Sequence, residues 1–182
     1  MGMFVCLAGS TGVLAQTPQP DQTTATYGSW TLSCRIHAAS KVQAGADVVK
    51  TSTGEAKGEK RVKLCEVTQR YSGPTPAELA FAPSKKHADK TIASFRTPVD
   101  VYLPFNPSIA VDDKEIAKGR FLRCRGRACI ANFVFDDAAV SALAASKSGT
   151  LSYKQSTGAL QNIPISGAGL KNALAAYKAA LK

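Results

Sequence analysis

The sequence predicts a mainly β fold, namely a single antiparallel β-sandwich-like domain with two short helices. Three observations support this prediction. Several segments alternate apolar and polar residues with a period of two, which is the pattern of half-buried strands. Only two segments have the apolar spacing of a helix. The chain of 182 residues, 45% of them hydrophobic, has about the size and apolar content of one domain.

The N-terminal segment has the character of an export signal. Residues 1–15 contain no charge and end in Val13-Leu14-Ala15, with the small residue that a cleavage site needs. A basic start is missing, so we expect this signal peptide to be incomplete; the alternative is an unstructured N-terminus. The run is too short and interrupted to cross a bilayer, and Cys6 lacks the context of a lipid anchor. Residues 16–26 are expected to be a flexible lead-in, and residues 27–182 the domain.

The domain begins with a strand in "YGSWTLSCRIH", where alternate residues from Trp30 to Ile36 share one face and predict a buried position for Trp30. Residues 38–60 are polar and glycine-containing, and we expect a mobile loop. "RVKLCEVTQRY", residues 61–71, resumes the strand pattern. Short strands are then predicted at 78–83 and 91–98, followed by a β-rich run at 99–109.

The residues 121–135, "FLRCRGRACIANFVF", predict a hairpin with apolar flanks and a basic tip at Arg125-Gly126-Arg127-Ala128. A helix is predicted at 136–149, capped by Asp136 or Asp137 and ended by Gly149. Two strands, at 150–155 and 159–165, precede a C-terminal helix at 167–182. Its apolar stripe consists of Leu170, Leu174 and Tyr177.

Removal of the leader leaves four cysteines, namely Cys34, Cys65, Cys124 and Cys129. An even number in an exported chain favours disulfides. Of the three pairings we favour Cys34 with Cys65, which ties two strands across the polar loop, and Cys124 with Cys129, which face each other across the hairpin. In the chain-entropy model these bonds contribute about 3 to 4 and about 2 kcal/mol, respectively.

The segments "YGSWTLSC", "LCEVTQ", "GRFLRCRGRACIANF" and "IPISGAGLKNALAAY", taken in order, resemble the invasion-associated locus B family of exported bacterial proteins. The resemblance implies a periplasmic or outer-surface location, a β-sandwich-like fold and no catalytic activity. It also implies a contribution to host-cell invasion in pathogens, although relatives are widespread in other bacteria. Only the four cysteines and Trp30 match as structural positions, and no catalytic residue is carried over.

Metal, redox and hydrolytic chemistry have little support in the sequence. The spacing of Cys124 and Cys129 is wrong for a common zinc site, and neither cysteine belongs to a C-x-x-C motif at a helix start. We therefore predict no metal and no cofactor. His87 and a carboxylate are the only base system available to a hydrolase, and His87 lies in the polar run "SKKHADK". A cryptic envelope hydrolase that uses His87 is the alternative function.

The charge indicates an anionic partner. The chain has 23 Lys and Arg against 13 Asp and Glu, a net charge of +10. If their strands lie close together, five residues form one basic field for an anionic envelope component, a phospholipid surface or a host surface. These candidate binding residues are Arg61, Lys63, Arg123, Arg125 and Arg127. Basic segments with few aromatics, together with export, argue against nucleic acid. A structural periplasmic scaffold with no specific ligand is a further alternative.

Overall fold

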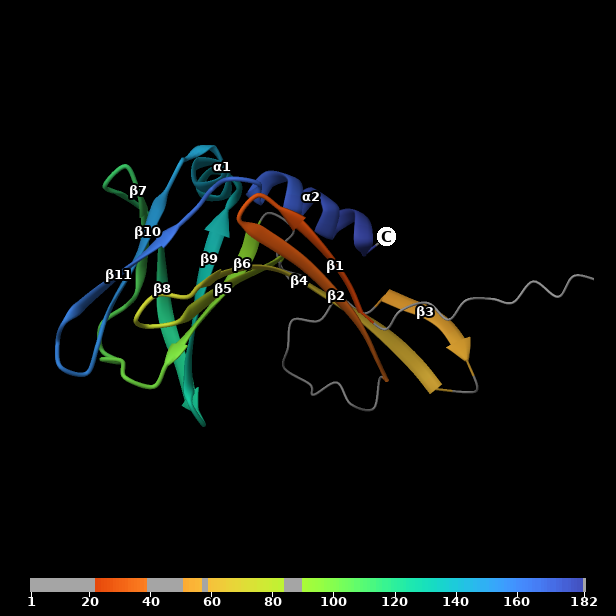
Figure 1. Ribbon diagram of the computed structural model, residues 1–182, viewed down its shortest axis with the longest axis horizontal. Helices are drawn as coiled ribbons and strands as arrows, with labels where there is room; N and C mark the ends of the chain where they lie inside the picture. The colour runs from red at the N-terminus through yellow and green to blue at the C-terminus, as the bar shows by residue number, and fades with distance from the viewer. Residues whose placement is uncertain (1–21, 39–50, 57–58, 84–89, 182) are drawn as a thin grey trace, which may run out of the picture.

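Eleven strands and two helices make up the described part of the chain (Figure 1). The computed structural model describes residues 22–38, 51–56, 59–83 and 90–181. Ten strands follow one another in the antiparallel order β1-β2-β4-β5-β6-β9-β8-β7-β10-β11, and β3 pairs with β4 beside this path. The strands are β1 (Gln22–Tyr27), β2 (Trp30–Ala38), β3 (Thr51–Ala56), β4 (Glu59–Tyr71), β5 (Ala77–Pro83), β6 (Lys90–Pro98), β7 (Ser108–Val111), β8 (Lys114–Arg125), β9 (Ala128–Asp136), β10 (Gly149–Lys154) and β11 (Leu160–Ile165). The predicted mainly β, sandwich-like class with two helices is confirmed.

The sheet curls so that β10 and β11 face β4 and β6 across an apolar core. The rings of Phe95 in β6 and Tyr153 in β10 lie 5.5 Å apart between centroids. Directly after β11, the Ser166 N–H donates to Gln69 Oε1 of β4 at 3.0 Å. These contacts join strands that are far apart in the sheet order, and they produce the two layers of a sandwich-like domain.

The core follows from the alternation in the sequence. Residues that lie opposite each other in paired strands share a face of the sheet. Leu32 of β2 pairs with Val67 of β4, which pairs with Phe81 of β5, and all three side chains are buried. Trp30 is fully buried, and its ring meets the Phe81 ring edge-on with 5.3 Å between centroids.

Helix α1 (Asp137–Ala145) follows the hairpin, and α2 (Leu170–Ala180) closes the chain. Asp136 caps α1 by accepting a hydrogen bond from the Ala139 N–H at 2.8 Å. The predicted stop at Gly149 is wrong, because α1 ends at Ala145 and is capped by Ser146, whose N–H donates to the carbonyls of Ala142 and Leu143. Gly149 is instead buried at the start of β10, where a Cβ atom would lie 3.0 Å from a backbone oxygen of β7.

The residues of the predicted apolar stripe in α2, namely Leu170, Leu174 and Tyr177, are buried. Figure 1 shows both helices at one end of the sheet, with α2 running beside β1 and β2. No helix within the described ranges is long and apolar enough to span a bilayer.

Three irregular segments differ from the prediction. Residues 22–26, expected to be flexible, belong to β1, which pairs with β2 from Gln22 to Tyr27. Within the predicted loop 38–60, residues 51–56 form β3, which pairs with β4. Backbone pairing at the margins of a sheet needs no apolar side chains, so composition does not reveal it. Conversely, only residues 108–109 of the predicted β run at 99–109 are strand. Residues 1–15 and His87 lie outside the described residues.

Candidate functional site

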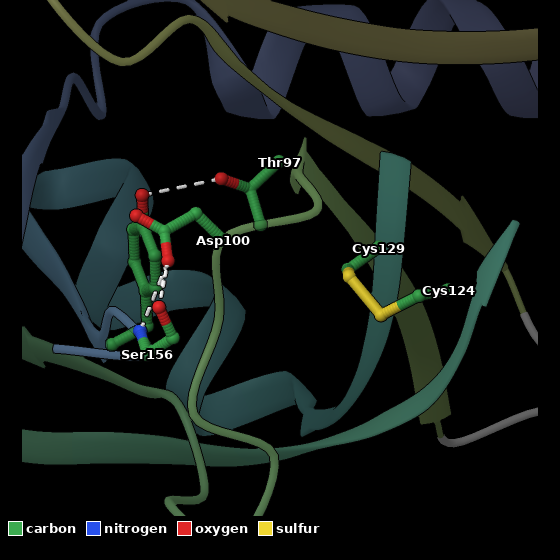
Figure 2. The surroundings of a disulfide bond; sticks show 6 residues. Thr97, Asp100, Cys124, Cys129 and Ser156 are labelled. Atoms are coloured by element: carbon green, nitrogen blue, oxygen red, sulfur yellow. Dashed lines mark hydrogen bonds between the residues drawn. A yellow bond between two sulfur atoms is a disulfide. The ribbon is translucent and has the colours of Figure 1, made fainter. Parts of the chain in front are cut away.

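Two disulfides cross-link the strands that carry the predicted site residues. Cys34 is bonded to Cys65 across β2 and β4, and Cys124 to Cys129 across β8 and β9. Each pair occupies directly opposed positions in its ladder. Figure 2 shows the second disulfide beside the residues that anchor the segment after β6. The bond between β8 and β9 fixes the hairpin one residue from the point where β8 ends.

The tip of this hairpin is a two-residue turn that presents arginines to solvent. β8 ends at Arg125 and β9 begins at Ala128, so Gly126 and Arg127 form the turn. Gly126 has a φ of +59° and open space around its Cα, which suits glycine in a tight hairpin turn. Arg123, Arg125 and Arg127 are all exposed. The hairpin therefore ends in a short turn that is held by the Cys124–Cys129 disulfide and carries three exposed arginines.

The five basic residues proposed from the sequence do not form one surface. Strands β5, β6 and β9 lie between β4, which carries Arg61 and Lys63, and β8. Lys63 shares its face with Cys65, and its Nζ donates to the Ala180 carbonyl of α2 at 3.0 Å. Arg123 lies on the opposite face, directly across from Ile130. The structure therefore brings together the hairpin arginines and leaves Arg61 and Lys63 on the side of α2.

Two arginines that sequence reasoning did not select join the hairpin instead. The ladder places Arg70 of β4, Glu78 of β5 and Arg96 of β6 side by side, and Arg96 lies opposite Ile130, which pairs with Arg123. Arg70 Nε donates to Glu78 Oε2 at 2.7 Å, and Arg96 Nη1 donates to Glu78 Oε1 at 3.3 Å. One carboxylate thus orients two guanidinium groups on the outer face of the sheet.

These arginines are accessible to a ligand. The Arg70 and Arg96 side chains are 68% and 61% exposed, whereas Glu78 is 16% exposed. An open cavity of about 320 Å³ adjoins them, with Tyr71, Pro98 and Ala128 among its lining residues. We use the name "arginine end" for Arg70, Arg96, Arg123, Arg125 and Arg127. Guanidinium groups bind phosphate, sulfate and carboxylate through paired N–H donors, so the arginine end has the chemistry of an anion-binding surface.

The described residues contain no group of three or more His, Cys, Asp and Glu side chains arranged to hold a metal ion. The fold and this surface thus define a class of protein, namely a disulfide-bonded β-sandwich-like domain with a basic, solvent-exposed end. The chain belongs to the invasion associated locus B (IalB) protein family, whose model matches residues 19–178.

A solved structure supports the fold. The chain is similar to the crystal structure of invasion associated protein B from Bartonella henselae, with a TM-score of 0.61 and 19% sequence identity. The similarity covers 86% of this chain and 95% of the Bartonella chain. Among curated proteins, none matches this sequence significantly.

Proposed function

We propose that this chain is an exported, non-enzymatic interaction protein that binds an anionic partner in the bacterial envelope or on a host surface. The arginine end carries the proposal, because it combines the hairpin arginines with Arg70 and Arg96, which share the single carboxylate of Glu78. A set of cations held on a sheet attracts anionic surfaces over roughly a Debye length, about 8 Å at physiological salt.

Export is part of the proposal. Two disulfides are typical of proteins in oxidising compartments, and the family is named after an invasion-associated locus. We propose that residues 1–15 act as the signal peptide and that the mature chain resides in the periplasm or at the outer surface. Adhesion to an anionic host surface is the way in which such a protein would contribute to invasion by a pathogen.

The test is a comparison of two charge-matched variants on an immobilised sulfated polysaccharide, heparin. The first variant, R123S/R125S/R127S, removes three cations from the arginine end. The control, K114S/K147S/K171S, removes three exposed cations from the first residue of β8, the segment after α1 and the first turn of α2. Both variants have the same net charge.

We expect the arginine variant to elute at clearly lower salt than the wild type, and the lysine control to elute close to it. Equal shifts for the two variants would mean that only net charge matters, and unchanged elution of the arginine variant would overturn the proposal. Circular dichroism of both variants checks that the fold is retained.

A further inference from the structure

Exposed apolar side chains gather at the same end of the molecule as the arginines. Within the described residues, six large apolar side chains are 48% to 57% exposed. Five of them lie near the arginine end, and the sixth, Val134, lies farther along β9. We name these five the apolar fringe: Val99, Tyr102, Leu103, Leu122 and Leu160. Soluble domains seldom cluster exposed apolar side chains without a binding role.

The strand register brings the apolar fringe to the hairpin tip. Val99 follows Pro98, which pairs with Ala128 beside the turn. The Tyr102 N–H donates to the Lys154 carbonyl at 2.8 Å, and Lys154 pairs with Leu160. Figure 1 shows the β8–β9 tip, the segment after β6 and the β10–β11 turn at the end of the molecule away from the helices.

The segment that carries Tyr102 and Leu103 is held in place. The Asp100 carboxylate accepts hydrogen bonds from the Ser156 N–H, at 3.2 Å, and from the Ser156 hydroxyl (Figure 2). Val101 is buried, and the Phe105 N–H donates to the Tyr102 carbonyl at 3.0 Å. The apolar side chains are therefore presented by a fixed backbone, so a binding partner need not order the loop.

The charge around the apolar fringe is strongly positive. The segments 70–78, 96–105, 123–128 and 154–160 carry six basic side chains, the five arginines of the arginine end and Lys154. They carry only two acidic side chains, Glu78 and Asp100, so their net charge is +4. Arginines beside exposed leucine and tyrosine match an anionic bilayer, where cations meet phosphates and apolar side chains enter the headgroup boundary.

We infer that the arginine end and the apolar fringe together bind the surface of an anionic phospholipid bilayer, with Tyr102 and Leu103 inserted among the headgroups. This inference rests on the proposed function and names its partner. A sulfated polysaccharide would engage the arginines but would leave the leucines in water. The exposed apolar side chains are the observation that favours a lipid surface.

The test is flotation with vesicles of phosphatidylcholine, with and without phosphatidylglycerol. The wild type should float only with the anionic vesicles. Leu103→Ser should weaken this binding by roughly four- to tenfold, since Leu103 is 54% exposed and only the exposed part of its side chain leaves water on insertion. The matched control is Val134→Ser, because Val134 is 57% exposed but lies outside the apolar fringe. It should bind as the wild type does.

Insertion itself is measured with Leu103→Trp. The natural sequence has one tryptophan, Trp30, which is fully buried and supplies a constant background. On anionic vesicles the fluorescence of this variant should shift to the blue, and brominated lipids should quench it, whereas the fluorescence of the wild type should not change.

The outcomes separate this inference from the proposed function. If Leu103→Ser binds anionic vesicles like the wild type, or if Leu103→Trp shows neither shift nor quenching, the lipid inference is overturned. Retention on heparin that still depends on the hairpin arginines would then identify a polyanion such as a glycan as the partner. If R123S/R125S/R127S elutes from heparin as the wild type does, the proposed function fails as well.

Discussion

The Trp30 indole donates its Nε1–H to the carbonyl of Ser166 at 2.8 Å and so joins residues 136 positions apart. Trp30 begins β2, the second strand in the sheet order, and Ser166 directly follows β11, the last strand, so this bond joins strands near opposite ends of the curled sheet. Gln69 of β4 adds a second link, because its Oε1 accepts from the Ser166 N–H. The buried Trp30 thus links β2 to the end of β11 across the two layers.

Replacing this indole should cost much of the stability of the domain. Trp30→Phe removes the donor and leaves a cavity in the core, and the half-buried Ser166 carbonyl keeps only the longer bond from Gln69 Nε2, at 3.4 Å. We expect a loss of about 2 to 4 kcal/mol in the free energy of unfolding. Urea denaturation measures it, with the exposed Leu122→Ala as a control that should change stability by less than about 0.5 kcal/mol. A loss for Trp30→Phe no larger than for the control would contradict this role.

The two disulfides should differ in their contribution to stability. The Cys34–Cys65 bond spans 31 positions and the Cys124–Cys129 bond spans 5. In the chain-entropy model, replacing each pair by alanine should lower the free energy of unfolding by about 3 to 4 and about 2 kcal/mol, respectively. Equilibrium urea unfolding of the two double variants measures the difference. A greater loss from the shorter loop would contradict this account.

Two glycines with the same backbone conformation allow a matched test of close packing. Gly169 and Gly158 have φ values of +86° and +85°. A Cβ on Gly169 would lie 2.0 Å from the Tyr27 carbonyl oxygen, whereas a Cβ on Gly158 would meet nothing within 4 Å. Gly158→Ala should therefore cost only the left-handed strain, about 1 to 2 kcal/mol, and Gly169→Ala clearly more. Thermal unfolding of the pair measures the difference; equal losses would rule out the proposed contact between the start of α2 and β1.

Burial of Tyr177 makes stability depend on alkaline pH. Burial raises the pKa of this phenol from 10.0 to about 12. Below pH 10 both states hold the proton and the contribution to stability is complete. Between about pH 10 and pH 12 the unfolded chain releases the proton while the folded chain retains it, so stability falls by about 2 to 3 kcal/mol.

Tyr177→Phe removes this titration without removing the ring. The variant should therefore lose less stability than the wild type when urea unfolding at pH 9.5 is compared with unfolding at about pH 11.5, since lysines titrate in both proteins. Parallel losses in the two proteins would show that Tyr177 does not carry the effect.

Strong local patterns predict much of the fold. The cysteines of the 121–135 hairpin oppose each other because the apolar flanks and the Arg-Gly-Arg turn specify a tight antiparallel pair. The stripe in α2 is likewise a local signal. β1 is different, because its side chains are mostly exposed and its strand conformation depends on pairing with β2. From its polar composition alone, this segment is predicted to be a loop. Its strand conformation becomes evident only when its pairing with β2 is known.

The candidate site depends on which strands are neighbours in the sheet and on how their residues are paired. Local sequence patterns do not reveal either. Arg70 and Arg96 lie in different strands and meet only because β5 places Glu78 between them. In contrast, the sequence does indicate that Lys63 and the hairpin arginine Arg123 lie on opposite faces of the sheet. Lys63 is two residues from Cys65 and shares its face, whereas Arg123 is adjacent to Cys124 and lies on the opposite face.

The most direct test of the anion-binding claim adds charge to the arginine end instead of removing it. Glu78→Gln keeps a polar side chain between Arg70 and Arg96 but removes the carboxylate that partly neutralises them. Because a damaged fold is not expected to strengthen binding, a gain is more informative than a loss. We predict that this variant elutes from heparin at higher salt than the wild type. Elution at the same or lower salt, with an intact fold, would contradict the account.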